Sequence, residues 1–262
     1  MRLVLDLAKG VEQNASDYFE KAKKIKKKIK GAEEALRQNT KKLEEFEKKK
    51  EKFESEEEKT KNTIARKKEW YEKFRWFFSS DGFLVVGGRD ATSNEVVIKK
   101  HTDSSDLVFH ADMAGSPFFV IKSDGKKIPE ATIKEAADAT CTFSRAWKLG
   151  LQSSDVFYVP PEQVSKKTKA GEYMGKGAFM VYGKSNYVEN KINLAIGIAK
   201  DRAIMSGPVE AIKKNCEKFV ALKQGDEKVS NIAKKINYKL GGNFDLDEII
   251  RALPAGSFGL MQ

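Results

Sequence analysis

The chain has 262 residues, of which 33% are charged, and its formal net charge is +11 at pH 7. Its two cysteines, Cys141 and Cys216, are too few for a disulfide framework and lie in no CxxC or CxH pattern, so we expect no zinc site and a reduced, cytoplasmic location. The sequence has no apolar stretch of 18 residues and no signal-peptide pattern at its N-terminus, so no membrane partner is expected.

The positive charge is unevenly distributed and divides the chain into three parts. Residues 1–76 hold 23 Lys and Arg against 16 Asp and Glu, residues 77–189 hold 14 of each, and residues 190–262 hold 12 against 8. We expect a coiled-coil arm over 1–76, a globular domain over 77–189 and a C-terminal extension over 190–262. A basic excess is typical of proteins that bind a polyanion, although a surface that only confers solubility has the same composition.

The first part carries one heptad register, which predicts a coiled coil. Its apolar positions are Ala15, Tyr18, Ala22, Ile25, Ile29, Ala32, Leu36, Leu43, Phe46, Phe53, Ile64, Tyr71 and Phe74. The register weakens between 47 and 63, where Lys50, Glu57 and Thr60 take core positions. This favours an antiparallel hairpin that turns within 37–60. The alternative is one helix about 90 Å long, which would self-associate with another chain.

From Phe83 the pattern changes to short β-branched and aromatic runs between glycine turns, which is typical of an antiparallel sheet. Strands are expected at 83–86, 96–99, 107–110, 118–122, 156–159 and 179–182, and a helix at 133–149 that ends at Gly150. Beyond residue 190 we expect strands at 193–198 and 219–222 and helices at 209–216, 228–240 and 246–253. The predicted fold class is α+β: a long antiparallel coiled-coil hairpin, a small mixed α/β domain with an antiparallel sheet, and a small C-terminal α/β appendage.

Catalytic motifs are scarce. The two histidines, His101 and His110, lack partners at triad or metal spacing, and the Gly-Gly-Arg-Asp run at 87–90 lacks a phosphate-binding glycine pattern and is not expected to open a helix. Three aspartates, Asp90, Asp106 and Asp112, could together hold a cation for a metal-dependent nuclease, but turn carboxylates are the commoner use of such residues. We therefore expect a protein that is not an enzyme and that binds no metal or cofactor.

Two lysine-rich segments favour contact with RNA. Residues 163–184 contain five lysines, one acid, several glycines and the aromatic residues Tyr173, Phe179 and Tyr182. Ammonium groups beside exposed rings suit RNA, because phosphates meet the cations while unpaired bases stack on the rings. Residues 21–30 contain seven lysines. In both segments the alternative is a solvated surface with no ligand.

Several motifs resemble, in order and spacing, the NFACT-R domain, the RNA-binding domain of ribosome quality-control proteins of the nuclear export mediator factor and fibronectin-binding-like type. These motifs, which fall within residues 70–188, are WYEKFRWFFSSDGFLVVGGRDATSNEVVIKKH, DLVFHAD and QVSKKTKAGEYMGKGAFMVYGK. The upstream VEQNASDYFEKAKKIKKKI is similar to the start of the family's coiled-coil arm. The tail, with IMSGPVEAIKKN and LDEIIRALPAG, is similar to the archaeal branch.

The resemblance implies a protein that binds the large ribosomal subunit and tRNA when stalled translation is rescued. Together with the loop composition, it assigns RNA contact to Arg89, Lys99, Lys100, His110, Lys166, Lys167, Lys169, Tyr173, Lys176 and Lys184. It assigns the ribosome-facing surface of the coil to Lys23, Lys24, Lys26, Lys27, Lys28 and Lys30. We expect His110 to shape the site rather than to catalyse.

One departure from the family limits the expected activity. The family's N-terminal domain and helix-hairpin-helix domain should precede the coil, which here begins near residue 14. The N-terminal domain is tied to C-terminal tailing of the stalled chain, so we expect no tailing by this chain alone, whether it is part of a larger protein or a short relative. The rival function is a coiled-coil scaffold that binds proteins and has no direct role with RNA.

Overall fold

The computed structural model describes residues 4–60, 68–166, 174–242 and 244–261, with the side chains of all of these except 44–60. The chain divides into two compact units, Met1–Ile64 and Ala65–Gln262, which are described in turn. The predicted α+β class is confirmed, with a long N-terminal helix and, in the second unit, helices and antiparallel sheets. Among the described residues, no helix combines the length and apolar character that a membrane span requires.

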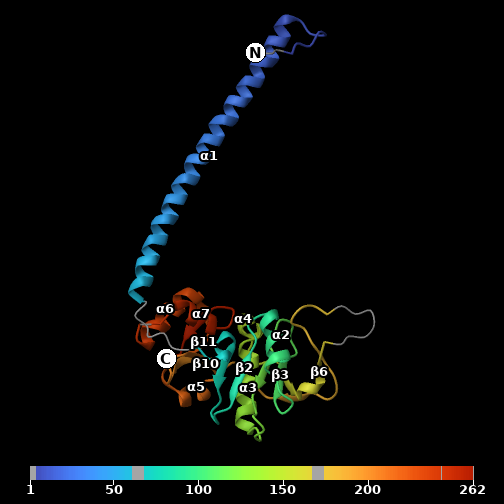
Figure 1. Ribbon diagram of the computed structural model, residues 1–262, viewed down its shortest axis with the longest axis vertical. Helices are drawn as coiled ribbons and strands as arrows, with labels where there is room; N and C mark the ends of the chain where they lie inside the picture. Colours follow the sequence, from blue (N-terminus) through green and yellow to red (C-terminus); the bar gives the residue numbers. More distant parts are fainter. Residues whose placement is uncertain (1–3, 61–67, 167–173, 243, 262) are drawn as a thin grey trace. The chain divides into compact units, whose positions relative to one another are not determined.

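The first unit is built on a single helix, α1, which runs from Val11 to Thr60 without interruption (Figure 1). The hairpin turn expected within residues 37–60 is therefore wrong for this structure. The physical reason lies in the sequence: residues 32–60 contain no glycine or proline and are rich in Glu and Lys, which favour a continuous helix. At 1.5 Å per residue the helix is about 75 Å long. Its heptad side chains Ile25, Ile29 and Leu36 are more than half exposed.

The C-terminal end of the predicted heptad pattern does not belong to the coil. Tyr71 lies in a short 3₁₀ helix, η1 (Trp70–Lys73), and Phe74 leads into strand β1 (Arg75–Phe78). The ring of Tyr71 lies 4.8 Å from that of Trp76, and Phe74 is buried. These aromatic residues are part of the core of the second unit, and their heptad spacing is coincidental.

The second unit contains a six-stranded antiparallel sheet with the strand order β1-β2-β4-β3-β5-β8. Its remaining strands are β2 (Leu84–Gly87), β3 (Leu107–Ala111), β4 (Phe119–Ile121), β5 (Val156–Val159) and β8 (Asn186–Val188). The predicted strands at 83–86, 107–110, 118–122 and 156–159 are confirmed within one or two residues. Strands β1 and β8 were not predicted.

The strand predicted at 96–99 is wrong, because these residues lie in helix α2 (Ala91–Lys100). Asp90 caps this helix, and its carboxylate accepts a hydrogen bond from the Ser93 amide at 2.8 Å. The Ser93 hydroxyl accepts from the amide of Asp90 in return, also at 2.8 Å. This reciprocal cap outweighs the preference of the β-branched residues that follow for extended backbone. The Gly-Gly-Arg-Asp run thus opens a helix, contrary to expectation.

The helix predicted over 133–149 is two helices, α3 (Glu130–Thr142) and α4 (Arg145–Leu149). Ser144 separates them: its hydroxyl donates to the Cys141 carbonyl at 2.6 Å and accepts from the Ala146 amide at 3.0 Å, which starts a new helix. The predicted stop at Gly150 is confirmed, with a φ of 73°.

A second antiparallel sheet follows, with the strand order β10-β9-β11-β12. Its strands are β9 (Leu194–Ala199), β10 (Ile204–Gly207), β11 (Cys216–Glu227) and β12 (Phe258–Leu260), and its helices are α5 (Val209–Asn215), α6 (Val229–Leu240) and α7 (Leu246–Ala252). A two-stranded hairpin of β6 (Val164–Ser165) and β7 (Met180–Val181) and a short 3₁₀ helix, η2 (Pro161–Gln163), precede it. The predicted elements at 193–198, 209–216, 219–222, 228–240 and 246–253 are all confirmed, although β11 is longer than expected.

The two faces of the six-stranded sheet belong to different hydrophobic clusters. Successive residues of a strand point to opposite faces: Val85 packs into the larger cluster, whereas Val86 packs into a smaller one with Val97 of α2. The larger cluster joins Phe77 of the first sheet to Met205 and other residues of the second. Residues on both sides of position 190 therefore share one core. The domain boundary predicted at that position stays a prediction.

Candidate nucleic-acid interface

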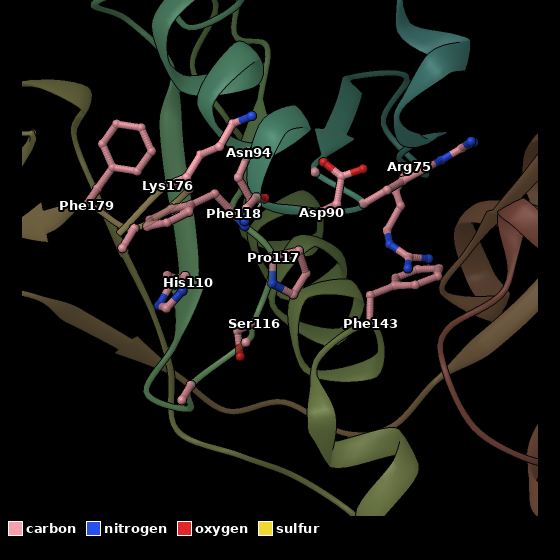
Figure 2. Close-up of a pocket in the computed structure, with 17 residues that line it drawn as sticks. Arg75, Asp90, Asn94, His110, Ser116, Pro117, Phe118, Phe143, Lys176 and Phe179 are labelled. Atoms are coloured by element: carbon pink, nitrogen blue, oxygen red, sulfur yellow. Dashed lines mark hydrogen bonds between the residues drawn. The ribbon is translucent and has the colours of Figure 1, made fainter. Parts of the chain in front are cut away.

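A cavity of about 420 Å³ opens where α2 begins, beside β3 and the loop at 114–118 (Figure 2). The segment at 176–179, which leads into β7, forms another of its sides. Two close approaches bring these segments together. Gly88 leaves no room for a side chain, since a Cβ there would lie 1.9 Å from the Asn94 Oδ1 atom, which accepts from the Phe118 amide. Gly177 has a φ of +77°, and its Cβ would lie 2.4 Å from the Ala91 Cα.

One wall of the cavity is aromatic. The His110 ring on β3 stacks on the Phe118 ring, with centroids 4.3 Å apart, and the edge of Phe179 meets Phe118 at 5.4 Å. Nζ of Lys166 lies 4.8 Å from the centre of the Phe179 ring. Burial lowers the pKa of His110, although a hydrogen bond with the backbone of Ser116 and the charge of Asp112 oppose this. The imidazole is therefore neutral at neutral pH, and the wall can receive a flat ring.

Two arginines, Arg75 and Arg89, line the other side of the cavity and are half-buried. The Arg75 guanidinium lies 4.5 Å from the centre of the Phe143 ring and donates to the Leu253 carbonyl at 3.0 Å. Arg89 donates to the Phe74 carbonyl at 2.9 Å, while its buried Nε has no hydrogen-bond partner. Both guanidiniums are held by carbonyl groups, and within the described residues neither forms an ion pair with a carboxylate.

The two arginines repel each other. Burial, followed by the charge of Arg89, lowers the pKa of Arg75 to about 9. Burial and the charge of Arg251 lower the pKa of Arg89, and Asp90 partly offsets this. Half-buried like charges raise the free energy of the empty site, and an anion placed between them would lower it. The arrangement is therefore suited to a phosphate, which a guanidinium can bind through two parallel hydrogen bonds.

Arg75 and Arg89 also line a second cavity, of about 370 Å³. Its other residues include Lys73, Arg251 and Trp70, whose ring is 39% exposed and stacks on His101 at 4.2 Å. The carboxylates of this cavity include that of Glu248, which pairs with Lys68. Arg75 and Arg89 therefore line two neighbouring cavities, and each cavity has aromatic rings in its lining.

Three of the residues assigned to RNA contact from the sequence, Arg89, His110 and Lys176, line the first cavity. Lys176 is exposed, and its charge contributes to a lowered pKa of Asp90, after the larger effect of the hydrogen bond from the Ser93 backbone. These residues are far apart in the sequence, and the fold brings them to one place.

The other assigned residues that the structure describes are not part of the lining of this cavity. Lys99 and Lys166 both pair with Glu95, at 3.1 and 3.0 Å, and Lys100 is exposed at the end of α2. Lys184 lines another hollow, together with Tyr158. Three assigned residues, Lys167, Lys169 and Tyr173, lie outside the described residues. The coil lysines Lys23, Lys24, Lys26, Lys27, Lys28 and Lys30 are all exposed on α1.

Sequence reasoning missed Arg75, Asn94, Ser116 and Phe118 as residues of the cavity. Arg75 carried only a weak signal, since it is one of two cations, with Lys73, inside the aromatic run WYEKFRWFF. The three aspartates considered as a cation site have separate roles: Asp90 caps α2, Asp106 is buried in an ion pair with Lys122, and the charge of Asp112 acts on His110, whose pKa it raises. Within the described part of the chain, no three His, Cys, Asp or Glu residues are grouped as a metal site would require.

Comparison with known proteins identifies the family of this region. Residues 73–183 match the family described as the NFACT protein RNA binding domain. The chain is 41% identical over 202 residues to the archaeal Rqc2 homolog aRqcH of Methanocaldococcus jannaschii, which covers 75% of this chain and 30% of that protein. It is 35% identical over 180 residues to the human ribosome quality control complex subunit NEMF, covering 67% of this chain and 16% of that protein.

A further sequence relative and one solved structure are also similar to parts of this chain. Ribosome quality control complex subunit 2 of Schizosaccharomyces pombe is 31% identical over 186 residues, which cover 70% of this chain and 18% of that protein. The solved C-terminal part of the fibronectin/fibrinogen-binding protein of Streptococcus suis aligns with a TM-score of 0.38 and 19% identity, over 49% of this chain and 48% of that one. The chain spans 30% or less of the length of the three sequence relatives. It is thus a homologue of ribosome quality control subunits, and its residues 73–183 are an NFACT protein RNA binding domain.

Proposed function

We propose that this chain is the RNA-binding part of a cytoplasmic ribosome quality control factor that binds tRNA and the large ribosomal subunit on stalled translation complexes. The observation that supports this most is the pair Arg75 and Arg89, which lack carboxylate partners among the described residues and face a cavity inside an NFACT RNA binding domain. Two of the relatives are named as ribosome quality control complex subunits, which supports the ribosomal context.

The mechanism we propose is electrostatic docking with little reading of base sequence. Phosphates would meet Arg75, Arg89 and Lys176 around the first cavity, and the exposed lysines of α1 would face ribosomal RNA. Each phosphate neutralised by a cation releases counterions, so the affinity should fall steeply with salt. The role proposed is binding rather than catalysis, because the cavity offers guanidiniums, an ammonium group and aromatic rings, and its one carboxylate, that of Asp90, caps α2.

The test is to measure binding of the chain to purified tRNA and to isolated large subunits across a salt series. We expect tight binding that weakens steeply with salt. Replacing Lys166, Lys167 and Lys176 by Glu should weaken tRNA binding by about two orders of magnitude. It should also lower the salt slope by about one for each phosphate that a lysine no longer neutralises.

A matched control has the same change of charge on another surface: Lys228, Lys234 and Lys239, which are exposed at or on α6, replaced by Glu. This control should retain most of the affinity for tRNA. An equal decrease in tRNA affinity in both triple variants would mean that binding depends on the net charge of the protein and not on the position of the lysines. Weak, salt-insensitive binding by the wild type would contradict the proposed function.

A second candidate is a coiled-coil scaffold that binds proteins, and the exposed apolar side chains of α1 favour it. Ile25, Ile29, Leu36 and Leu43 are 52–73% exposed and lie in one heptad register. Sedimentation without RNA distinguishes the two candidates. Stable self-association through α1, together with no salt-sensitive RNA binding, would favour the scaffold function over RNA binding.

A further inference from the structure

We infer that the cavity at the start of α2 holds one unpaired nucleotide of an RNA strand, with its base against the wall of His110, Phe118 and Phe179 and its phosphate on Arg75 and Arg89. This inference rests on the proposed function and goes further, since it names the part of the RNA that the site accepts. Four observations support it.

The first is size and enclosure. The cavity has a volume of about 420 Å³, which lies in the usual range for small-molecule sites and is enough for one nucleotide. It is a hollow rather than a flat face, bounded by the β2–α2 turn, the loop at 114–118 and the segment at 176–179 (Figure 2). A paired base inside a duplex cannot enter such a hollow, so the site selects bases that are free of a partner strand.

The second is the division of the lining into a cationic side and a flat apolar side. In Figure 2, Arg75 stands on one side, and the stacked rings of His110 and Phe118 stand on the other, next to Phe179. The lining also includes Arg89 and the carboxylate of Asp90, so its cations outnumber its acids. A nucleotide has the same division, with a charged phosphate at one end and a flat ring at the other. Bases stack on aromatic side chains with little regard to sequence.

The third is a pair of polar atoms that lack partners. Ser116 is only 4% exposed, lines the cavity, and its hydroxyl oxygen has no hydrogen-bond partner within the described residues. The same holds for Nε of the half-buried Arg89. Buried polar groups in folded proteins are almost always hydrogen-bonded. Both atoms are closed off from solvent here, so a ligand would supply the missing partner after a small movement of the Ser116 or Arg89 side chain.

The fourth favours a strand over a free nucleotide. Arg75 and Arg89 line the second cavity as well, where Trp70 and Arg251 provide a further ring and a further cation. A strand that leaves the first cavity across the two guanidiniums would enter a second hollow of about 370 Å³, whose lining holds five basic side chains and three glutamates. A single nucleotide would use only one of the two.

The test fills the cavity without changing its charge. Ala178 and Ala114 are exposed residues of the lining, and Ala178→Leu and Ala114→Leu add apolar bulk there. Binding is measured at constant salt for a single-stranded RNA oligomer and for a blunt RNA duplex of the same length. We expect both variants to bind the single strand roughly tenfold more weakly, and to bind the duplex with the wild-type affinity and salt slope.

The matched control is Ala131→Leu, which adds the same side chain on an exposed position of α3 outside the cavity and should change neither affinity. Thermal unfolding of all three variants shows whether they are folded. Single-strand binding that is unchanged in folded Ala178→Leu and Ala114→Leu, with steep salt dependence retained, overturns the inference and leaves the proposed function in place. No salt-dependent RNA binding by the wild type overturns the proposed function itself.

A second measurement on the wild type does not depend on any variant folding. An oligomer that contains 4-thiouracil is crosslinked by light, and the modified peptides are identified by mass spectrometry. Crosslinks within 107–122 or 174–184 support the inference, and crosslinks confined to α1 overturn it. Displacement of the oligomer by adenosine monophosphate at the same concentration would show that the cavity takes a free nucleotide, which overturns the assignment to a strand.

Discussion

Lys122 has a buried ammonium group, which pairs with one buried carboxylate, that of Asp106, and one exposed carboxylate, that of Asp103. Its Nζ donates to Asp106, to Asp103 at 2.6 Å and to the His101 carbonyl at 3.0 Å, and the Asp106 side chain is 1% exposed. Burial lowers the pKa of Lys122, but the hydrogen bonds to the two carboxylates outweigh it, so the net pKa is raised. The pair is stable only while both charges are present.

We therefore expect Lys122→Met to lower the free energy of unfolding by about 3–5 kcal/mol, because it leaves Asp106 charged and buried without its partner. The matched control is Lys99→Met, which removes a lysine 55% exposed that pairs with Glu95 on the surface. Such surface pairs contribute about 1 kcal/mol or less. Urea unfolding followed by tryptophan fluorescence measures both. A similar destabilisation of the two variants would contradict the structural role of Lys122.

His110 makes stability depend on pH. Burial lowers its pKa in the folded protein, so the unfolded chain binds a proton more readily as pH falls through about 6.5. The neutral imidazole therefore makes its full contribution to the free energy of unfolding above that pH, and this contribution is lost as the pH falls below it. We expect wild-type stability to decrease from pH 7.5 to 5.5, and His110→Gln to decrease less. Unfolding curves at several pH values test this, and equal pH dependence in both proteins would contradict it.

Single residues of the site were predictable only where the sequence marked them. Arg89, His110 and Lys176 stand out by residue type near glycines or strand ends, and they line the cavity. Arg75 did not stand out, because it lies among aromatic residues that fit the heptad pattern of the coil. Contacts over long sequence distances decide its role, such as its hydrogen bond to the Leu253 carbonyl.

At the scale of elements, two glycines allow a direct comparison of backbone strain with packing. Gly150 ends α4 with a φ of +73° and has open space around its Cβ direction. Gly177 has a similar φ of +77°, but a Cβ there would lie 2.4 Å from the Ala91 Cα at the start of α2. The first glycine is required by conformation alone, and the second by conformation and close contact.

We expect Gly150→Ala to cost about 1–2 kcal/mol through the left-handed backbone, and Gly177→Ala to cost about 1–3 kcal/mol more through overpacking. The measurement is the free energy of unfolding of both variants in urea. Gly177→Ala should also weaken RNA binding, because the segment at 176–179 must move away from α2. Equal stability of the two variants would show that the contact at Ala91 relaxes without cost.

The type of an element was predictable where the local signals agreed. The prediction failed where a helix cap, or the lack of a glycine or proline that would end a helix, determined the structure. The residues 96–99 look like a strand, yet the cap at Asp90 makes them helical. The weak heptad positions at 47–63 look like a turn, yet no glycine or proline stops the helix there, and α1 continues to Thr60. Hydrophobic periodicity reports which side chains seek a core, whereas caps and breakers determine where a helix begins and ends.

At the scale of the whole molecule, the hydrophobic clusters lie entirely within the second unit. The buried members of both clusters fall between Phe74 and Phe258, and the three tryptophans at 70, 76 and 147 belong to the same unit. We expect residues 65–262 alone to fold and to unfold in urea at the same midpoint as the full chain. Tryptophan fluorescence reports this unit specifically, and a clearly lower midpoint for the shorter chain would contradict its independence.

The sequence by itself determined the α+β class, the helical arm, most strands of the second unit, and the RNA-binding family through motifs of matching order. These features depend on local patterns: periodicity, glycine turns and clustered lysines. Only the tertiary structure decided that residues on both sides of position 190 share one core, and that Arg75, Arg89, His110 and Lys176 meet at one cavity. The reason is physical, since strand order and side-chain burial depend on contacts between residues far apart in the chain, and no local pattern contains that information.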